Sequence, residues 1–251
     1  MNREEAQKVL HCAMSVGELL HTSGAEAGRV EDTIRRICIA YGATRVDVFS
    51  ITSTIVTTIF GEEFEFCTQS RRVPPMKNDF TRLDKLNQLS RWICAKHPDP
   101  DEIPARIEAI RSGRTYGFWT QLFIYGMIAG AFTIFFGGNL QDMLSSAVIG
   151  VILKCLEAFI LRTSFNSLLT ALLCSSAGGF LSHLMVLMGL GVHADLISIG
   201  NIMLFIPGVM FTNSLRDLFS GDTITGLIRC AESLLMAVIV ALGFTFAGFL
   251  F

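Results

Sequence analysis

The chain changes character near residue 114, from spaced apolar positions to long apolar runs. In residues 1–114, apolar side chains recur at helix or strand spacing between charged residues. In residues 115–251 they merge into runs close to the length of roughly 20 residues that a helix needs to cross a bilayer. The pattern predicts a mixed fold: a small α+β domain over 1–114, followed by an all-α transmembrane bundle over 115–251.

The first domain is expected to begin and end with helices. Residues 3–21 predict one helix, and Ser23–Glu26 fits a capping box that opens a second helix, which stops at Gly42. A third helix is expected after the two prolines at 74–75. The run Asp99–Glu102 supplies an N-cap and a proline at the first helical position of a last short helix.

Between these helices the spacing changes to that of strands. Residues 46–59 are rich in Val, Ile, Ser and Thr and predict one or two strands. Gly61 and Glu62 make a plausible turn into a further strand over 63–70, in which apolar and polar residues alternate. The Ser/Thr content could suggest a hydroxyl nucleophile, but no His/Asp partner lies at a recognisable spacing, so a structural role is favoured.

Five apolar runs predict five transmembrane helices joined by short connections. Their expected bounds are Phe118–Phe136, Met143–Leu161, Leu168–Leu190, Leu196–Leu215 and Ile228–Phe251. Lys and Arg flank one set of ends and are absent from the connections 137–142 and 191–195. By the positive-inside rule, this places the first domain in the cytoplasm and the C-terminus outside.

Composition narrows the classes of function. Residues 1–114 carry 16 of the 20 Lys and Arg and 16 of the 22 Asp and Glu, and the net charge is −2. No basic stripe with interleaved aromatic residues points to nucleic acid. The seven cysteines are dispersed and the histidines show no ligand spacing, so neither a disulfide framework nor a metal site is predicted. No cofactor motif is present, and the chain is not expected to be an enzyme.

The fourth apolar run is interrupted by Pro207 and Gly208. Proline removes a backbone donor, and in lipid the freed groups must find protein, water or ligand. A helix interrupted in this way is typical of a transporter's binding region, although a harmless kink has the same sequence signature. Candidate residues of a substrate path are those around the break and the polar residues after it: Asn201, Pro207, Gly208, Thr212, Asn213, Asp217 and Arg229.

These residues suggest specific roles. If the helix continued regularly, Asn201, Gly208 and Thr212 would share one face and line the path. Arg229 could hold a substrate carboxylate with its bidentate guanidinium. Alternatively, Asp217 and Arg229 pair with each other and fix the inner loop.

Two carboxylates inside the predicted spans are candidates for ion coupling. Glu157 lies three residues after Lys154, and Glu232 lies three residues after Arg229, all toward the expected cytoplasmic side. Charges within spans are costly and commonly face a cavity or each other. A closed Lys154–Glu157 pair, or side chains that reach the interface, would give them a purely structural role.

Several short motifs, in a fixed order, resemble the threonine/serine exporter (ThrE) family, and within it the shorter YjjP-like split form. They are Gly24-Ala25-Glu26 with Val30-Glu31, the segment Ser53–Thr58, and Pro207-Gly208 followed by Asn213, Asp217, Gly221, Gly226 and Arg229. The resemblance covers nearly the whole chain.

The resemblance implies a subunit of a bacterial inner-membrane exporter of small carboxylates, either succinate-like dicarboxylates or threonine/serine-like amino acids. It also implies a second, YjjB-like small membrane subunit, because full-length members carry about twice as many spans. Partners would then be this subunit, the substrate and the lipid bilayer, with a higher oligomer possible. Energy would come from an ion gradient, since no ATP-binding motif is present.

A different class of function is compatible with the same layout. The α+β domain could be an enzyme or sensor, with the helices as a membrane anchor. An anchor needs one span and no buried carboxylate, which favours the exporter.

Overall fold

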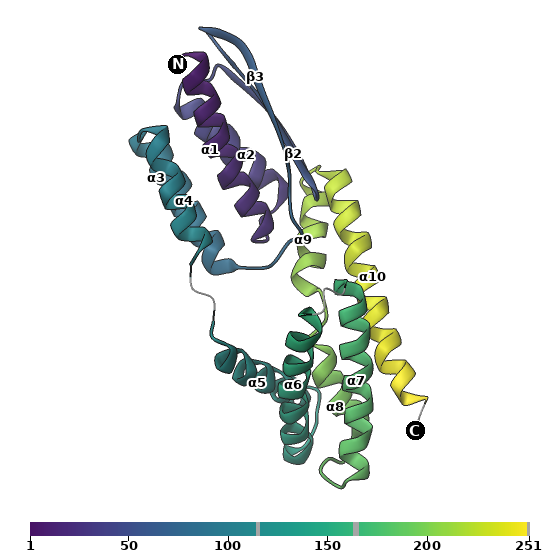
Figure 1. Cartoon of the computed structure of the whole chain (residues 1–251). Coiled ribbons are helices and arrows are strands. Elements are labelled where there is room, and N and C mark those ends of the chain that lie inside the picture. Colours follow the sequence, from purple (N-terminus) through teal and green to yellow (C-terminus); the bar gives the residue numbers. More distant parts are fainter. Residues whose placement is uncertain (114–115, 163–165, 250–251) are drawn as a thin grey trace. The chain divides into compact units, whose positions relative to one another are not determined.

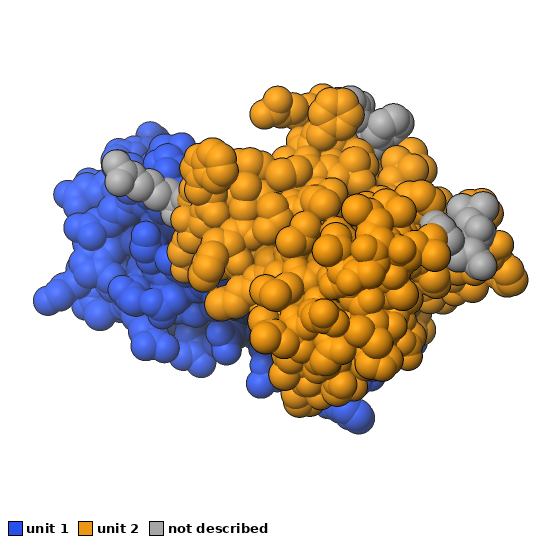
Figure 2. All heavy atoms as spheres, turned by 90° about the horizontal axis from the view of Figure 1, so that it is seen from below, with its two compact units in different colours: residues 1–114, 209–230 blue, residues 115–208, 231–251 orange. Residues whose placement is uncertain are grey.

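The chain folds into two compact units, seen in blue and orange in Figure 2. The computed structural model describes residues 1–113, 116–162 and 166–249. Unit 1 is Met1–Arg114 with Val209–Cys230, and unit 2 is Thr115–Gly208 with Ala231–Phe251. The predicted domain boundary after residue 114 falls outside the described residues, and the division into 1–114 and 115–251 stays a prediction.

The helices of unit 1 form where the apolar spacing predicts them (Figure 1). They are α1 (Arg3–Thr22), α2 (Ala27–Ala40), α3 (Phe80–Lys96), the 3-10 turn η1 (Pro100–Glu102) and α4 (Ile103–Arg111). The predicted cap before the last helix is confirmed, since the Asp99 side chain accepts a hydrogen bond from the Asp101 amide. Helices α1 and α2 pack closely, because a Cβ on Gly17 would lie 2.5 Å from Ile34 Cδ1.

Three antiparallel strands follow one another in sequence order within one sheet. They are β1 (Arg45–Ile51), β2 (Thr54–Gly61) and β3 (Phe64–Arg72). Alternate residues of β2 are buried, with Ile55, Thr57 and Ile59 toward the core. On the other face Thr58 and Thr68 share a hydrogen bond of 2.9 Å between their hydroxyls. The sheet therefore contributes one face to the same core as α1, α2 and α3.

The predicted capping box at Ser23 is wrong. Ser23 is the C-cap of α1, and α2 begins later, with Glu26 as an N-cap that makes no side-chain capping bond. Gly24 has a φ of +100°, a conformation that glycine adopts without the strain of a side chain. The turn from Ser23 to Glu26 is therefore shaped by a C-terminal glycine, and it leaves the first amides of α2 open for another partner.

Unit 1 also contains α9 (Gly208–Phe219) from Val209 onward and the first turns of α10 (Thr223–Gly248). The chain turns between these helices at Gly221, whose φ is +93°. Thr225 of α10 donates to the carbonyl oxygen of Ser50 at 3.0 Å. A segment distant in sequence thus completes the fold of the N-terminal residues.

Unit 2 is built from α5 (Phe118–Phe135), α6 (Leu140–Leu161), α7 (Ser167–Leu187), α8 (Ala194–Ile202) and the rest of α10. Among the described residues, four helices are long and apolar enough to cross a membrane: α5, α6, α7 and α10. The prediction of five such helices is wrong in its count. Many large apolar side chains on these helices are exposed, as lipid-facing surfaces require.

The discrepancy lies in the predicted span Leu196–Leu215, which is divided into two short helices. Helix α8 ends at Ile202, and α9 begins at Gly208. Turn-type bonds from the amides of Leu204 and Phe205 to Asn201 and Ile202 close the end of α8. Proline at 207 cannot donate to a continuing helix, so the apolar run breaks rather than kinks.

Small residues of the apolar helices pack against helices of the same chain. A Cβ on Gly130 of α5 would lie 3.2 Å from Met143 of α6, and one on Gly179 of α7 would lie 2.8 Å from Ala247 of α10. Close helix approach is the expected use of such residues. These small residues therefore find packing partners within the described residues.

Candidate functional site

The predicted site residues are divided between the two units. Thr212, Asn213, Asp217 and Arg229 belong to unit 1. The remaining candidates belong to unit 2: Asn201, Pro207, Gly208, Glu157 and Glu232. The single helical face predicted for Asn201, Gly208 and Thr212 does not form, because no regular helix connects residue 202 to residue 208.

In unit 1, Arg229 and Asp217 form a buried ion pair. The Nη1 group of Arg229 donates to Asp217 Oδ2 at 2.7 Å, and the two side chains are 2% and 1% exposed. The turn at Gly221 reverses the chain, so that α10 brings Arg229 back to α9. Burial raises the pKa of the Asp217 carboxyl, whereas the guanidinium beside it stabilises the ionised form.

The pair also binds the turn between α1 and α2. Asp217 Oδ1 accepts a hydrogen bond from the Ala27 amide at 3.2 Å, and Nη2 of Arg229 donates to the Ala25 carbonyl at 3.3 Å. The carboxylate therefore serves as the missing cap of α2, where a negative charge is favourable. Each of the two charged groups is satisfied by its partner and by fixed backbone dipoles, as a buried pair requires.

His21 completes the surroundings of this pair. Its Nε2 lies 3.3 Å from Nη2 of Arg229, and the side chain is 2% exposed. Burial and the neighbouring guanidinium lower the pKa of His21 to about 4. The imidazole is therefore neutral at physiological pH and accepts a hydrogen bond rather than competing with Arg229 for Asp217.

Two further residues of α9 contact the same turn. Asn213 Nδ2 donates to the Gly24 carbonyl at 3.2 Å. Arg216 forms an ion pair with Glu26, at a more exposed position. Thr212 is exposed. The α1–α2 turn is thus held by Asn213, Arg216, Asp217 and Arg229 together, an arrangement that favours the structural explanation of the pair over a free substrate-binding guanidinium.

In unit 2, Asn201 lies in a buried polar seam among apolar helices. Its Nδ2 donates to Ser146 Oγ of α6 at 3.0 Å and to the Ile197 carbonyl of α8 at 2.9 Å. Thr133 of α5, also fully buried, donates to the Ala129 carbonyl at 2.9 Å. Gly200 allows this approach, since a Cβ there would lie 2.8 Å from the Ala129 carbonyl and 3.0 Å from Ser146 Oγ.

The amide oxygen of Asn201 is the unusual atom of this seam. It is fully buried, and no donor among the described residues reaches it. Leaving such an acceptor unpaired costs about 1–3 kcal/mol. If the amide were turned over, its NH2 group would be the unpaired one, so one polar atom of Asn201 lacks a protein partner in either orientation.

The residues at the break between α8 and α9 are loosely surrounded. Pro207 is half-buried, and the Gly208 amide donates to the Ile206 carbonyl at 2.8 Å. A Cβ on Gly208 would meet no heavy atom within 4 Å. Gly208 is therefore not required by packing, unlike Gly200.

The predicted pair of Lys154 and Glu157 is closed. Lys154 Nζ lies 2.8 Å from Glu157 Oε2 and 4.6 Å from the centre of the Tyr125 ring. The Tyr125 hydroxyl donates to the same carboxylate oxygen at 3.1 Å. Glu157 is therefore held by one cation and one hydroxyl. Glu232, in contrast, is exposed on α10.

Asp142 was not singled out from the sequence, although it is a buried carboxylate that connects two segments of unit 2. Asp142 caps α6 with Asn139, and its Oδ1 also accepts hydrogen bonds from the amides of Val192 and His193 at 2.7 and 3.0 Å. Asn139 followed by Asp142 is a recognisable helix cap in the sequence. The hydrogen bond from Val192 is not recognisable there, because Val192 lies 50 residues after Asp142. Among the described residues, no three His, Cys, Asp or Glu side chains gather into a group able to hold a metal.

These features define a multi-pass membrane protein with a partly separate α+β unit and a polar seam within its apolar helices. The family model described as "Putative threonine/serine exporter" matches residues 11–251. The chain belongs to the threonine/serine exporter (ThrE) family, a family of membrane transporters.

Two curated relatives are consistent with this assignment. The chain is 26% identical over 235 residues to the "Threonine/serine exporter" of Corynebacterium glutamicum, a match that covers 90% of this chain and 48% of that protein. It is 22% identical over 253 residues to the "Probable succinate transporter subunit YjjP" of Klebsiella aerogenes, covering 98% of this chain and 95% of the relative. The chain thus spans about half the length of the first relative. No solved structure matches it.

Proposed function

We propose that this chain is one subunit of a secondary exporter of small carboxylates. One relative is named for threonine and serine and the other for succinate. The solutes in these two names are small, polar and carry at least one carboxylate. An exporter of either type fits the family, and the driving energy would be an ion gradient.

The observation that carries this proposal is the unpaired amide oxygen of Asn201 in the apolar unit. An acceptor without a partner in a low-dielectric setting attracts a donor, such as a substrate ammonium or hydroxyl group or a coupled cation. It lies one residue before the end of α8, immediately ahead of the interrupted segment. We therefore keep Asn201, Pro207 and Gly208 as candidates for the substrate path in unit 2, where a buried polar group is followed by irregular backbone, and Thr212 as a candidate in unit 1.

Arg229, Asp217 and Asn213 take a different role in this proposal. Their hydrogen bonds are directed to each other or to the turn between α1 and α2. We propose that they hold α9 and α10 to the α1–α2 turn within unit 1, and that substrate reaches Arg229 only if this arrangement opens. Glu157 and Glu232 remain the candidates for ion coupling, Glu157 as a carboxylate paired with Lys154.

We also propose that a second membrane subunit completes the transporter. The name of the YjjP relative describes a subunit, and the Corynebacterium relative is about twice as long as the matched region. A separate YjjB-like protein would supply the remaining helices, with a higher oligomer as a further possibility. The assembly would reside in the bacterial inner membrane.

The orientation we propose keeps the α+β unit in the cytoplasm and the C-terminus outside. This orientation requires an odd number of crossings, whereas four long apolar helices are found among the described residues. The fifth crossing would be supplied by α8 and the broken apolar run up to the first turn of α9, ahead of Asn213 and Asp217, which hold the α1–α2 turn.

Efflux from proteoliposomes tests the proposal. Vesicles containing this chain with a YjjB-like subunit should release labelled succinate, threonine or serine under an imposed proton gradient, and vesicles with either protein alone should not. Asn201→Ala should reduce the efflux rate at least about tenfold, as expected for loss of a buried polar contact to the solute. Ser182→Ala is the matched control, because this buried hydroxyl is already bonded within its own helix.

The assay has clear opposing outcomes. Transport by this chain alone would contradict the two-subunit arrangement. Parent-like efflux by Asn201→Ala would remove Asn201 from the path. In the same vesicles, proton dependence that is unchanged in both Glu157→Gln and Glu232→Gln would exclude these carboxylates as proton carriers.

A further inference from the structure

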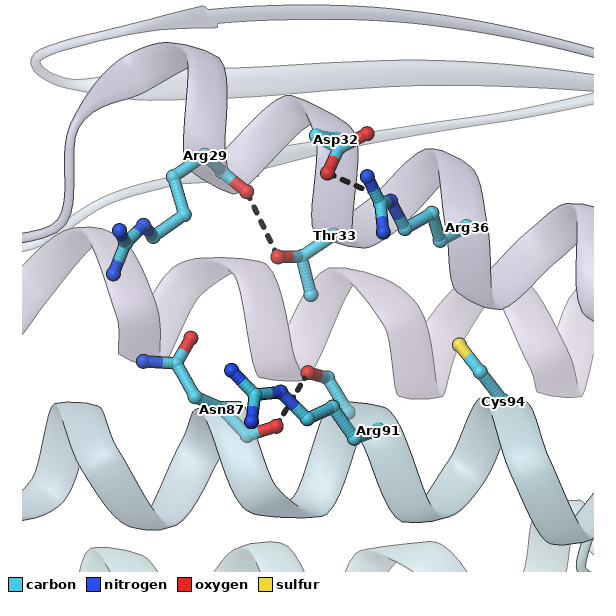
Figure 3. Close-up of a pocket in the computed structure, with 8 residues that line it drawn as sticks. Arg29, Asp32, Thr33, Arg36, Asn87, Arg91 and Cys94 are labelled. Carbon is cyan, nitrogen blue, oxygen red and sulfur yellow. Dashed lines mark hydrogen bonds and ion pairs between the residues drawn. The ribbon is translucent and has the colours of Figure 1, made fainter.

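A cleft lies in unit 1 between helices α2 and α3, and none of the predicted path residues lines it (Figure 3). Its volume is about 290 Å³, at the lower end of the range for small-molecule sites. One wall is formed by α2 and the other by α3, and Figure 3 shows side chains from both helices facing the space between them. The lining residues are Arg29, Asp32, Thr33, Arg36, Asn87, Ser90, Arg91 and Cys94.

The charge of this lining is strongly biased toward positive. Three arginines face one acidic residue, and that residue is already used: Asp32 pairs with Arg36 at 2.8 Å. Within the parts of the chain that the structure describes, neither Arg29 nor Arg91 forms an ion pair. The two unpaired guanidinium groups belong to opposite walls of the cleft, so a bound molecule could receive hydrogen bonds from both.

The remaining polar groups are compatible with an anion. Thr33 donates to the Arg29 carbonyl and Ser90 donates to the Asn87 carbonyl, each within its own helix. The Asn87 amide supplies a neutral donor at the rim. Burial raises the pKa of the Cys94 thiol, so this group adds no negative charge at neutral pH.

Exposed arginines on an amphipathic helix are commonly no more than a solvated surface. Here they differ from such a surface in two respects. They converge from two helices on one concavity, and the positive excess is two charges within a cleft of small-molecule size. Guanidinium groups in this arrangement offer planar, bidentate donors that match carboxylate and phosphate oxygens.

We propose that the cleft between α2 and α3 binds a compact dianion, a phosphate group or a dicarboxylate, through Arg29 and Arg91. The site is independent of the substrate path proposed above. It would let the α+β unit respond to a small anionic metabolite.

The thiol of Cys94 provides a direct readout, because it lines the cleft. The full chain in detergent is treated with a thiol reagent, and the modification rate of the Cys94 peptide is measured by mass spectrometry. Inorganic phosphate and succinate are the two probes, each at an ionic strength held constant with sodium chloride, so that general screening is equal. A bound dianion should slow modification of Cys94 several-fold, and the more effective probe distinguishes a phosphate ligand from a dicarboxylate.

Variants establish whether the arginines are responsible. Arg29→Gln and Arg91→Gln should each raise the dianion concentration needed for half-maximal protection of Cys94 about tenfold. The double variant should show no protection. Lys85→Gln is the matched control, an exposed cation of α3 that does not line the cleft. Equal melting temperatures would show that the variants are folded.

The proposal is overturned if neither probe protects Cys94, if chloride protects as well as the dianions, or if the double variant retains protection. None of these readouts depends on transport. Failure of efflux would therefore leave this binding site untouched, and failure of binding would leave the exporter proposal untouched.

Discussion

At the scale of single residues, Arg229 has an unusual position for a cation in a largely apolar chain. It is the largest fully buried side chain among the described residues. Its guanidinium reaches Asp217, Ala25 and His21, so its charge and its hydrogen-bond donors are both used. Such a group stabilises the fold only while all its partners remain, because an unpaired buried charge is far costlier than a missing contact.

Removing one member of the Asp217–Arg229 pair should therefore be strongly destabilising. We expect Arg229→Gln and Asp217→Asn each to lower the free energy of unfolding by about 3–5 kcal/mol, and the double variant to lower it by less than the sum. Arg216→Gln, in a more exposed pair with Glu26, should cost no more than about 1 kcal/mol. Thermal unfolding of the detergent-solubilised chain measures all four.

Charge reversal is a less suitable test of this pair. Exchanging the two residues would place a carboxylate against the Ala25 carbonyl and a guanidinium against the Ala27 amide, so rescue would be incomplete. The variant Arg229→Lys instead distinguishes a structural role of Arg229 from a role in binding a substrate carboxylate. A variant that folds as the parent but exports nothing would support a carboxylate-binding role for Arg229, whereas an Arg229→Gln variant as stable as Arg216→Gln would contradict the structural role.

At the scale of elements, glycines determine how closely the apolar helices approach. Gly200 of α8 sits against Thr133 and Ala129 of α5 and against Ser146 of α6. A Cβ added to Gly208, the first residue of α9, would have no heavy atom within 4 Å. The two glycines lie on either side of the same break, and the space around an added methyl group differs between them.

This difference predicts opposite outcomes for the same substitution. In Gly200→Ala the new methyl group would overlap Thr133 Oγ1 and lie too close to the Ala129 carbonyl, which is backbone and cannot move aside. We expect a loss of about 1–3 kcal/mol and a lower melting temperature. Gly208→Ala should keep the parent melting temperature. Equal effects of the two substitutions would show that α8 does not pack on α5 as described.

At the scale of the whole molecule, the break between α8 and α9 determines the number of crossings. The four long apolar helices alone would leave both chain ends on one side of the membrane. The proposed orientation, with the α+β unit in the cytoplasm, needs a fifth crossing from α8 and the broken apolar run up to the start of α9. The distribution of Lys and Arg among the connections is the basis for that orientation.

Cysteine labelling tests this topology. Cysteines introduced at Gln141 and Val192, which are both exposed, should react with a membrane-impermeant reagent added outside intact cells. A cysteine at Ser112 should react only after the membrane is opened. Peptide mass spectrometry identifies the labelled site, so the native cysteines stay in place. Labelling of the Ser112 position from outside would reverse the proposed orientation.

The sequence by itself determined the local structure, because the signals for it lie within a few residues. The helix and strand periods located α1 to α4 and the three strands, and the apolar runs located α5, α6, α7 and α10. The capping box at Ser23 failed because the turn there depends on a partner that is distant in sequence. The carboxylate that caps α2 comes from Asp217, 190 residues further along.

Only the tertiary structure decided which groups are paired. It divided the predicted fourth span into α8 and α9 around Pro207, which has no amide hydrogen to continue a helix. It placed Asn201 in one unit and Asp217 and Arg229 in the other. Periodicity specifies which side of a helix is apolar, but the identity of a buried group's partner depends on chain segments that meet only in the folded protein.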